Sequence, residues 1–413
     1  MIKETDKRIL DALCCAINGR TVTWGKDLTE DDWRALFRAA DDHNILPLVA
    51  DALPTELPEP YQKRVRQDIL AQASRSAELG LLLQHLYGRG LHPLVVKGMV
   101  CRSLYPEPEH RPSTDEDMLI DPAEFPRLHE ALLEYGLRPV NPEEDLYKNY
   151  EVSYRDPEQK LYLEVHKALF TREVPYLNRM NSCFRGAHAR AQAMEIYGVR
   201  VLTMGPDDHL LYLLLHALKH FLHSGVGIRQ VCDIALYSER FRDSISWGGL
   251  RRKLSELGVL EFARAIYGIA NEYLLTGKGM AGYFAGWELE RLDHEPMLRD
   301  IMEGGLYGTS TMSRAHSATM TLNAASRQHS GGIKALLHTV FRSRRSLVGR
   351  YRYLEKAPYL LPVAWAHRLL RYCRELLRGD RRTNSPLDSI RVGSERIRLL
   401  KQYHIISSKK SKE

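Results

Sequence analysis

Two aspartates separated by a single residue are the first side chains in this sequence that could do chemistry. Asp115 and Asp117 stand in the segment STDEDMLI, at the start of a short run with strand character. Because side chains alternate along a strand, both carboxylates would project from one face while Met118 and Ile120 pack against the other. Neighbouring carboxylates repel each other unless a cation joins them. The pair therefore predicts a site for divalent metal ions.

A later strand supplies a candidate for a third acid. The run LYLEVH alternates in strand fashion, which places Glu164 and His166 on one face and apolar residues on the other. Together, Asp115, Asp117 and Glu164 would form a three-carboxylate metal cage. Phosphoryl and nucleotidyl transfer use such cages, because one metal clamps the triphosphate and a second lowers the pKa of the attacking hydroxyl. A surface turn rich in acids is the alternative interpretation of STDED.

Positive charge and a glycine stand close to these acids in the sequence. Lys97 and Gly98 end the run LVVKG, and MVCRSLYP follows as a short helix whose free N–H groups would face the same cleft. A glycine at this point lets the backbone approach a phosphate closely. Arg111, four residues before Asp115, supplies a fixed charge for a phosphate. The alternatives are that Lys97 extends to solvent from a strand end and that Arg111 is a loop charge.

Helices surround the small segment that carries these groups. Thr29 caps one helix-like run with Asp32 three residues later, and Pro206 with Asp207 opens another. Between them, LHPLVVKG, IDPAEFPRLHEALLEYG and LYLEVH are typical of strands with one intervening helix. We therefore expect an α+β fold that is mostly helical overall. Its expected parts are an N-terminal helical domain (1–88), a small α/β core with a mixed sheet (89–205), a helical domain (206–340), and a basic helical segment with a flexible tail (341–413).

Composition excludes several classes of protein. The chain has 413 residues and six cysteines without a C-x-x-C spacing, which argues against a zinc clip and a dithiol redox motif. No window approaches the roughly 18 consecutive apolar residues of a membrane span, and the N-terminus lacks an apolar signal-peptide core. We expect reduced thiols, no transmembrane segment and a cytoplasmic location.

Basic charge is concentrated near the C-terminus. From Arg342 to Glu413 there are 19 Lys and Arg against 6 Asp and Glu, so the overall charge of +7 leaves −6 for residues 1–341. The run RSRRSLVGRYRY mixes arginine with tyrosine, which suits nucleic acid as a partner. The run APYLLPVAWAHRLLRYCRELLRG is apolar on one side and basic on the other, which suits a membrane surface. We favour a third interpretation, a basic helix packed on the acidic body.

Four histidines form a stripe on one predicted helix, because their spacings are seven, four and three residues. They are His209, His216, His220 and His223. A packed or solvated helix is the first interpretation; the second is that His216 and His220 line the cleft or contact the acceptor, and the third is a metal face. On the next predicted helix, Arg229 and Asp233 stand at i and i+4 and are expected to form an ion pair.

The order K-G, then R-x-S-x-D-x-D, then E-V-H resembles the bacterial uncharacterised nucleotidyltransferase family of the DNA polymerase β-type superfold. The run DDWRALFRAADDHNILPLV is similar to that family's leading helix, and VVKGMVCRSLYPEPEHRPSTDEDMLI is similar to its core. LLHALKHFLHSGVGIRQVCDIAL is similar to its helical segment, and FRSRRSLVGRYRY continues the likeness. The resemblance covers about residues 20–375.

The resemblance implies an α/β nucleotidyltransferase core with Mg²⁺ or Mn²⁺ as cofactor and a nucleoside triphosphate, such as ATP, as donor. By position, Asp115 and Asp117 match the metal-binding pair and Glu164 matches the third acid. Lys97 and Gly98 match the glycine turn before the phosphate-facing helix. The implied reaction moves a nucleoside monophosphate from the triphosphate to a hydroxyl acceptor, and pyrophosphate leaves.

Two residues depart from the pattern of the superfold. Met99 follows Gly98 where a serine usually helps to hold the triphosphate, and Glu116 stands between the aspartates where an apolar residue is usual. In a strand, Glu116 would point toward the core, so either the strand begins later or the metal site is altered. Both departures favour the alternative of a catalytically silent binding module. A toxin-like transferase that modifies RNA or protein is a third hypothesis, which differs only in the acceptor.

Overall fold

The structure is a computed structural model that describes most of the chain. It covers residues 2–305, except 25–27, 55–56, 159, 224 and 277–278, and then residues 321, 357–367 and 386–406. The arginine- and tyrosine-rich run at 342–353 lies outside the described residues, as does the amphipathic run at 357–379 beyond residue 367. The predictions of a nucleic-acid or membrane-surface partner fall on these runs and stay predictions.

The chain divides into two compact units. The first comprises Met1–Ala217 and Ile228–Arg299, and the second comprises Leu218–Gly227 and Asp300–Glu413. All elements of the candidate site described below belong to the first unit. The predicted four-part division of the chain stays a prediction.

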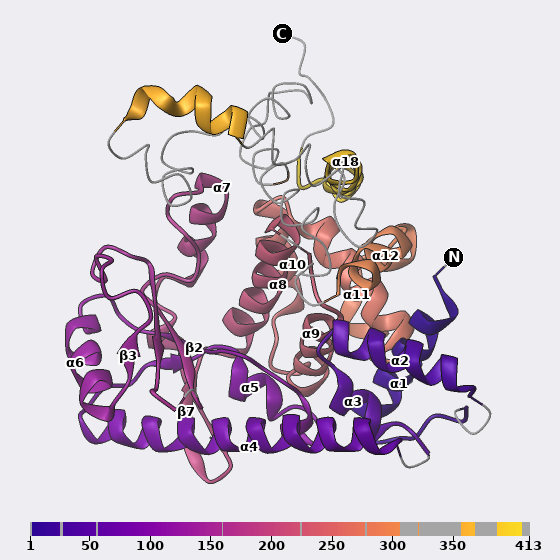
Figure 1. Cartoon of the computed structure of the whole chain (residues 1–413), viewed down its shortest axis with the longest axis horizontal. Coiled ribbons are helices and arrows are strands. Elements are labelled where there is room, and N and C mark those ends of the chain that lie inside the picture. Colours follow the sequence, from indigo (N-terminus) through magenta and orange to yellow (C-terminus); the bar gives the residue numbers. More distant parts are fainter. Residues whose placement is uncertain are drawn as a thin grey trace. The chain divides into compact units, whose positions relative to one another are not determined.

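Four helices precede the sheet: α1 (Glu4–Ile17), α2 (Glu30–Asp42), α3 (Leu46–Asp51) and α4 (Glu59–Gly88). The Thr29 hydroxyl accepts from the Asp32 N–H and the Asp32 carboxylate accepts from the Thr29 N–H, which confirms the predicted cap of α2. Helix α4 spans 30 residues, or roughly 45 Å at 1.5 Å per residue. It contacts α3, helix α6 (Phe125–Tyr135) and strand β7 (Val199–Thr203), so it connects the N-terminal helices to the α/β segment that follows them (Figure 1).

Five strands form a mixed sheet in the order β1-β2-β5-β4-β3. They are β1 (Leu94–Val95), β2 (Glu116–Leu119), β3 (Arg138–Pro139), β4 (Glu151–Arg155) and β5 (Tyr162–His166). Strands β2 and β5 run parallel, and the other neighbours run antiparallel. Between β2 and β3, helix α6 (Phe125–Tyr135) ends at Gly136, whose φ of 110° is a left-handed cap. The sheet and its flanking helices confirm the predicted α+β fold class.

The parallel pairing sets one register that matters for the site. Asp117 lies directly beside Glu164, and Leu119 lies beside His166. Because alternate residues of a strand share a face, these four side chains project from the same face of the sheet. Strand β1 runs antiparallel to β2, so Lys97, just after β1, returns to the end of the sheet where β2 begins.

A small hairpin and further helices follow the five-stranded sheet along the chain. The hairpin pairs β6 (Gln192–Ile196) with β7 (Val199–Thr203). The longer helices are α8 (Pro206–His223), α9 (Ile228–Arg240), α10 (Trp247–Glu256), α11 (Leu260–Tyr273) and α12 (Glu295–Gly304). The start of α8 at Pro206 agrees with the sequence prediction. Helix α1 packs against α9 and α11, so the N-terminal helices share a core with the later ones.

Short helical turns occupy much of the remaining described chain. They are α5 (Gly98–Arg102), η1 (Pro108–His110), α7 (Pro175–Asn178), η2 (Arg179–Phe184), η3 (His188–Arg190), η4 (Met280–Phe284) and η5 (Leu289–Arg291). In the second unit, the structure describes η7 (Pro358–Leu360) and α18 (Pro386–Gln402). Among the described residues, no helix combines the length and apolar character that crossing a membrane requires.

Candidate active site

Strands β2 and β5 bring two acids and one histidine into a compact group. One oxygen each of Asp117 and Glu164 and one ring nitrogen of His166 lie within 4.8 Å of one another. The side chains of Asp117 and His166 are almost completely buried, whereas that of Glu164 is 23% exposed. Carboxylate oxygens with an imidazole nitrogen are a donor set that binds divalent cations, so this group could hold a metal ion.

Lys97 places a positive charge at the same acids. Its ammonium nitrogen lies 2.8 Å from Asp117 Oδ2 and 3.3 Å from Asp115 Oδ2. The lysine side chain is only 9% exposed, so it does not extend to solvent from a strand end as the alternative interpretation required. It therefore links the two aspartates of the predicted pair.

His166 is held between acids of neighbouring strands. Its Nε2 lies 3.1 Å from Asp117 Oδ1, and its Nδ1 lies 3.5 Å from Glu151 Oε2 on β4. Glu151 pairs directly with His166 across β4 and β5. A carboxylate at the second nitrogen of a metal-binding histidine orients the ring, and Glu151 is placed for that role. We did not predict Glu151 from the sequence, because only the pairing of β4 with β5 brings it to His166.

The two paired acids have opposite pKa shifts. Burial raises the pKa of Asp117, but the charges of Lys97 and His166 outweigh burial and hold that pKa below its ordinary value. Burial, followed by the charges of Asp117 and Glu151, raises the pKa of Glu164 to about 7. Acids whose environments separate their pKa values in this way are typical of functional sites.

This geometry agrees with a match between the chain and a known protein family. A family model described as an uncharacterised nucleotidyltransferase matches residues 29–274. The chain belongs to this family. No curated protein and no solved structure matches the chain. The match confirms the resemblance drawn from the sequence, and it supports nucleotidyl transfer as the general activity. The run FRSRRSLVGRYRY lies beyond the matched residues.

The three predicted acids do not occupy equivalent positions. Asp115 precedes β2, is 18% exposed, and accepts a hydrogen bond from the Thr114 hydroxyl at 3.0 Å. The compact group of ligand atoms contains Asp117 and Glu164 with His166, and Asp115 is joined to it through Lys97. The role of Asp115 as a metal ligand stays a prediction.

Glu116 faces away from the aspartates on either side of it. Its carboxylate accepts from the Arg102 guanidinium at 2.6 Å and from the Met99 N–H at 3.0 Å, and its side chain is fully buried. We expected the N–H groups that open α5 to face a phosphate, but Met99 donates to Glu116 instead. The strand begins at Glu116, which points toward the core as the alternation required.

Packing against Glu116 also accounts for Gly98. Its φ is +34°, and a Cβ atom at this position would lie 1.9 Å from Glu116 Oε2. A side chain would therefore collide with a buried carboxylate whether or not a nucleotide is bound. The glycine expected for close approach to a phosphate is already required by the protein itself.

Arg111 does not occupy the position predicted for a phosphate contact. It is buried, and its Nε donates to Asp233 Oδ1 at 2.9 Å while a second nitrogen bonds Oδ2. The prediction of an Arg229–Asp233 ion pair is wrong, because Arg229 donates to the Pro112 carbonyl oxygen. Tyr105 also donates to Asp233, at 2.8 Å. These contacts fasten the loop before β2 to α9, so Arg111 positions that loop.

The four histidines of the predicted stripe lie on α8, and two of them are buried in the first unit. His209 is fully buried beside the Thr203 hydroxyl at 3.1 Å, and His216 is buried with its ring 5.4 Å from that of Tyr212. His220 belongs to the Leu218–Gly227 segment of the second unit. Within the described part of the chain, the one group of three metal-ligand side chains contains none of these histidines. Packing, the first interpretation, thus describes His209 and His216, and cleft contact by His216 and His220 stays a prediction.

Proposed function

We propose that this protein moves a nucleoside monophosphate from a nucleoside triphosphate to a hydroxyl acceptor, with Mg²⁺ or Mn²⁺ as its metal. The observation that carries the proposal is the register that sets Asp117 directly beside Glu164 on parallel strands. Two carboxylates at one height of a sheet, backed by His166, form a site whose oxygen donors suit these hard cations. Pyrophosphate is the second product.

The roles of the residues follow from their positions. Asp117 and Glu164 would hold the metal, with Asp115 at the edge and His166 beside them. When bound, the metal supplies the charge that stabilises the triphosphate and lowers the pKa of the attacking hydroxyl. Lys97 would contact a phosphate oxygen, since its ammonium lies at the aspartates. Glu164 is more exposed than Asp117 and His166, and it would accept the proton of the acceptor hydroxyl.

A catalytically silent binding module is the alternative from another class. Glu116 is one of the two residues that favoured this alternative. Its contacts with Arg102 and Met99 explain why an acid stands at this position, and they leave the metal-facing acids unchanged. Met99 is fully buried, and its side chain belongs to the core. Neither departure alters the metal-facing acids, and Lys97 still offers a positive charge to the triphosphate where Met99 lacks the usual hydroxyl, so we favour the active enzyme.

The decisive experiment follows a labelled α-phosphate. Each nucleoside triphosphate is incubated with the full chain, Mg²⁺ and a cell extract, and transfer of label is measured. The variants Asp117→Asn and Glu164→Gln should lower transfer by about 100-fold or more. Glu158→Gln, an exposed acid paired with Lys160 just before β5, is the matched control and should keep full activity. Equal transfer by the control and the two variants would contradict the proposal, and no transfer by any protein would favour the silent module.

A further inference from the structure

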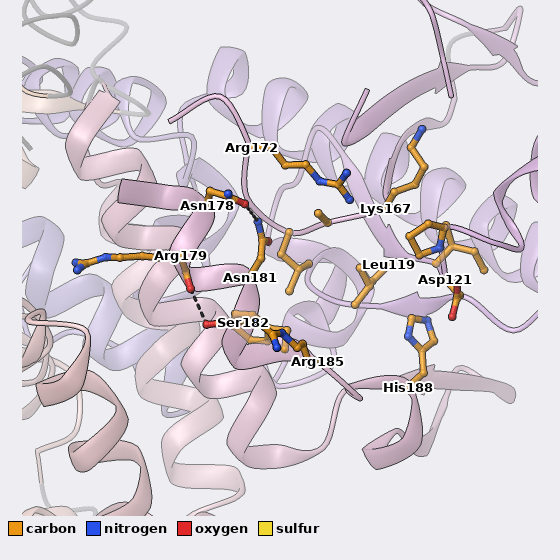
Figure 2. A pocket seen from close by; sticks show the side chains of 15 residues that line it. Leu119, Asp121, Lys167, Arg172, Asn178, Arg179, Asn181, Ser182, Arg185 and His188 are labelled. Atoms are coloured by element: carbon orange, nitrogen blue, oxygen red, sulfur yellow. Dashed lines mark hydrogen bonds between the residues drawn. The ribbon is translucent and has the colours of Figure 1, made fainter. Parts of the chain in front are cut away.

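A cavity of about 610 Å³ opens where β2 and β5 end, and its side chains are drawn in Figure 2. Leu119, Leu169 and Phe184 give it an apolar lining. Polar lining residues are mostly basic, and Asp121 is the one acid among the residues that form it. The volume lies in the range of sites that hold small molecules.

Three basic side chains around this cavity have no partner among the residues that the structure describes. Arg172, Arg185 and His188 make no side-chain hydrogen bond or ion pair with the described residues, and Arg172 and Arg185 are exposed. Arg179 differs, because it donates to the Leu257 carbonyl oxygen at 2.7 Å and lies over the Tyr176 ring. Figure 2 shows Arg179 extending away from the other lining side chains.

Lys167 also lines the cavity, but its ammonium is held by groups outside it. Lys167 donates to the Tyr147 carbonyl oxygen at 3.0 Å, and its ammonium lies 4.1 Å from the centre of the Phe125 ring. Neither Tyr147 nor Phe125 lines the cavity, and Figure 2 shows the Lys167 ammonium directed away from the other lining side chains. The charges that face a ligand are therefore those of the guanidinium groups without partners among the described residues, and guanidinium groups suit phosphate groups.

The cavity begins two residues beyond the candidate metal site along β2. Leu119, which lines it, lies beside His166 and two residues beyond Asp117 on the same face of β2. Two residues of a strand span roughly 7 Å. A small molecule in the cavity can therefore extend toward Glu164, which stands on the strand that leads into it.

We propose that this cavity binds the acceptor substrate and that the acceptor carries a phosphate monoester. The inference rests on the proposed function, in which the metal and Lys97 serve the triphosphate at the other end of the strands. The basic groups here then serve a second anion. The two guanidinium groups carry more positive charge than one carboxylate needs, and a dianionic phosphate matches them better. The apolar lining would contact the body of the acceptor and direct a hydroxyl toward Glu164.

The test measures binding without metal or nucleotide, so it does not depend on catalysis. The full chain is titrated with inorganic phosphate and ribose 5-phosphate, and with ribose and gluconate as uncharged and carboxylate arms. We expect both phosphates to bind, ribose not to bind and gluconate to bind at least tenfold more weakly. The double variant Arg172→Gln/Arg185→Gln should lose at least tenfold in phosphate affinity. Arg179→Gln is the matched control and should bind as the parent does.

Two results would overturn the inference: no binding of either phosphate, or equal phosphate binding by the parent and the double variant. Gluconate binding as strong as that of ribose 5-phosphate would overturn the assignment of a phosphate. Asp117→Asn separates the two proposals, since it should bind ribose 5-phosphate normally while it loses label transfer. Phosphate binding by a chain that transfers no label would mean that the proposed function fails while the anion site stands. Transfer without phosphate binding would mean the reverse.

Discussion

Glu116 and Arg102 form a fully buried ion pair, with Oε1 and Nη1 2.6 Å apart, on the side of β2 opposite to Asp117. The pair joins the first residue of the strand to the last residue of α5. Glu116 stands between two aspartates in the sequence, yet its carboxylate serves the core while theirs meet Lys97. One acidic triplet thus has two functions, because adjacent strand residues face opposite sides.

Breaking this pair should destabilise the protein. Glu116→Leu leaves the Arg102 guanidinium buried without its counter-charge, which costs about 3–5 kcal/mol. Arg102→Met combined with Glu116→Leu removes both charges and should recover much of the loss. Urea unfolding of the metal-free protein measures both. Equal stability of the single variant and the parent would contradict the structural role of Glu116.

Gly98→Ala should destabilise the protein even when no nucleotide is present. The new Cβ would meet Glu116 Oε2, and the backbone has a positive φ. We expect a loss of about 1–3 kcal/mol in thermal or urea unfolding. Gly90→Ala is the control, since Gly90 also has a positive φ but has no atom within 4 Å of the added carbon. If both variants lose the same free energy of unfolding, backbone strain alone explains why residue 98 is a glycine, and the contact with Glu116 contributes nothing.

Lys97→Met should strengthen the binding of Mn²⁺ alone and weaken label transfer. Removing the ammonium leaves Asp115 and Asp117 without their counter-charge, so a divalent cation would bind at least several-fold more tightly. Transfer should fall, because the triphosphate would lose the same ammonium. Titration followed by the paramagnetism of Mn²⁺ measures the affinity, and weaker Mn²⁺ binding by Lys97→Met would show that the lysine does not oppose the cation.

Acid should unfold the protein partly through His209. Burial lowers the pKa of this histidine from 6.5 to about 4, so the folded state keeps it neutral while the unfolded state takes up a proton below pH 6.5. Stability contributed by the neutral ring is therefore present above pH 6.5. It is lost as the pH falls toward 4, by up to about 1.4 kcal/mol per pH unit.

The measurement compares urea midpoints at pH 7 and pH 5. His209→Gln should lose less stability between these values than the parent, although it is less stable at pH 7. His188→Gln, an exposed histidine, should follow the parent at both. An unchanged pH dependence in His209→Gln would show that other groups cause the acid sensitivity.

Local patterns in the sequence were sufficient for part of this description. The Thr29 cap, the start of α8 at Pro206 and the alternation in LYLEVH depend on neighbouring residues alone, and the structure has all three. The faces of Asp117 and Glu164 followed from the same two-residue period. The family resemblance depended on the order of short motifs, and that order can be read from the sequence without a structure.

Only the tertiary structure decided which groups meet. Asp117 and Glu164 are 47 positions apart, and no local pattern states that their strands are parallel with these two residues level. Arg111 was predicted to meet a phosphate, but it meets Asp233 across 122 positions. A charged side chain in a core takes the nearest opposite charge once the chain is folded, because an unpaired buried charge is strongly unfavourable. The sequence determined which face each acid occupies, and long-range packing determined its partner.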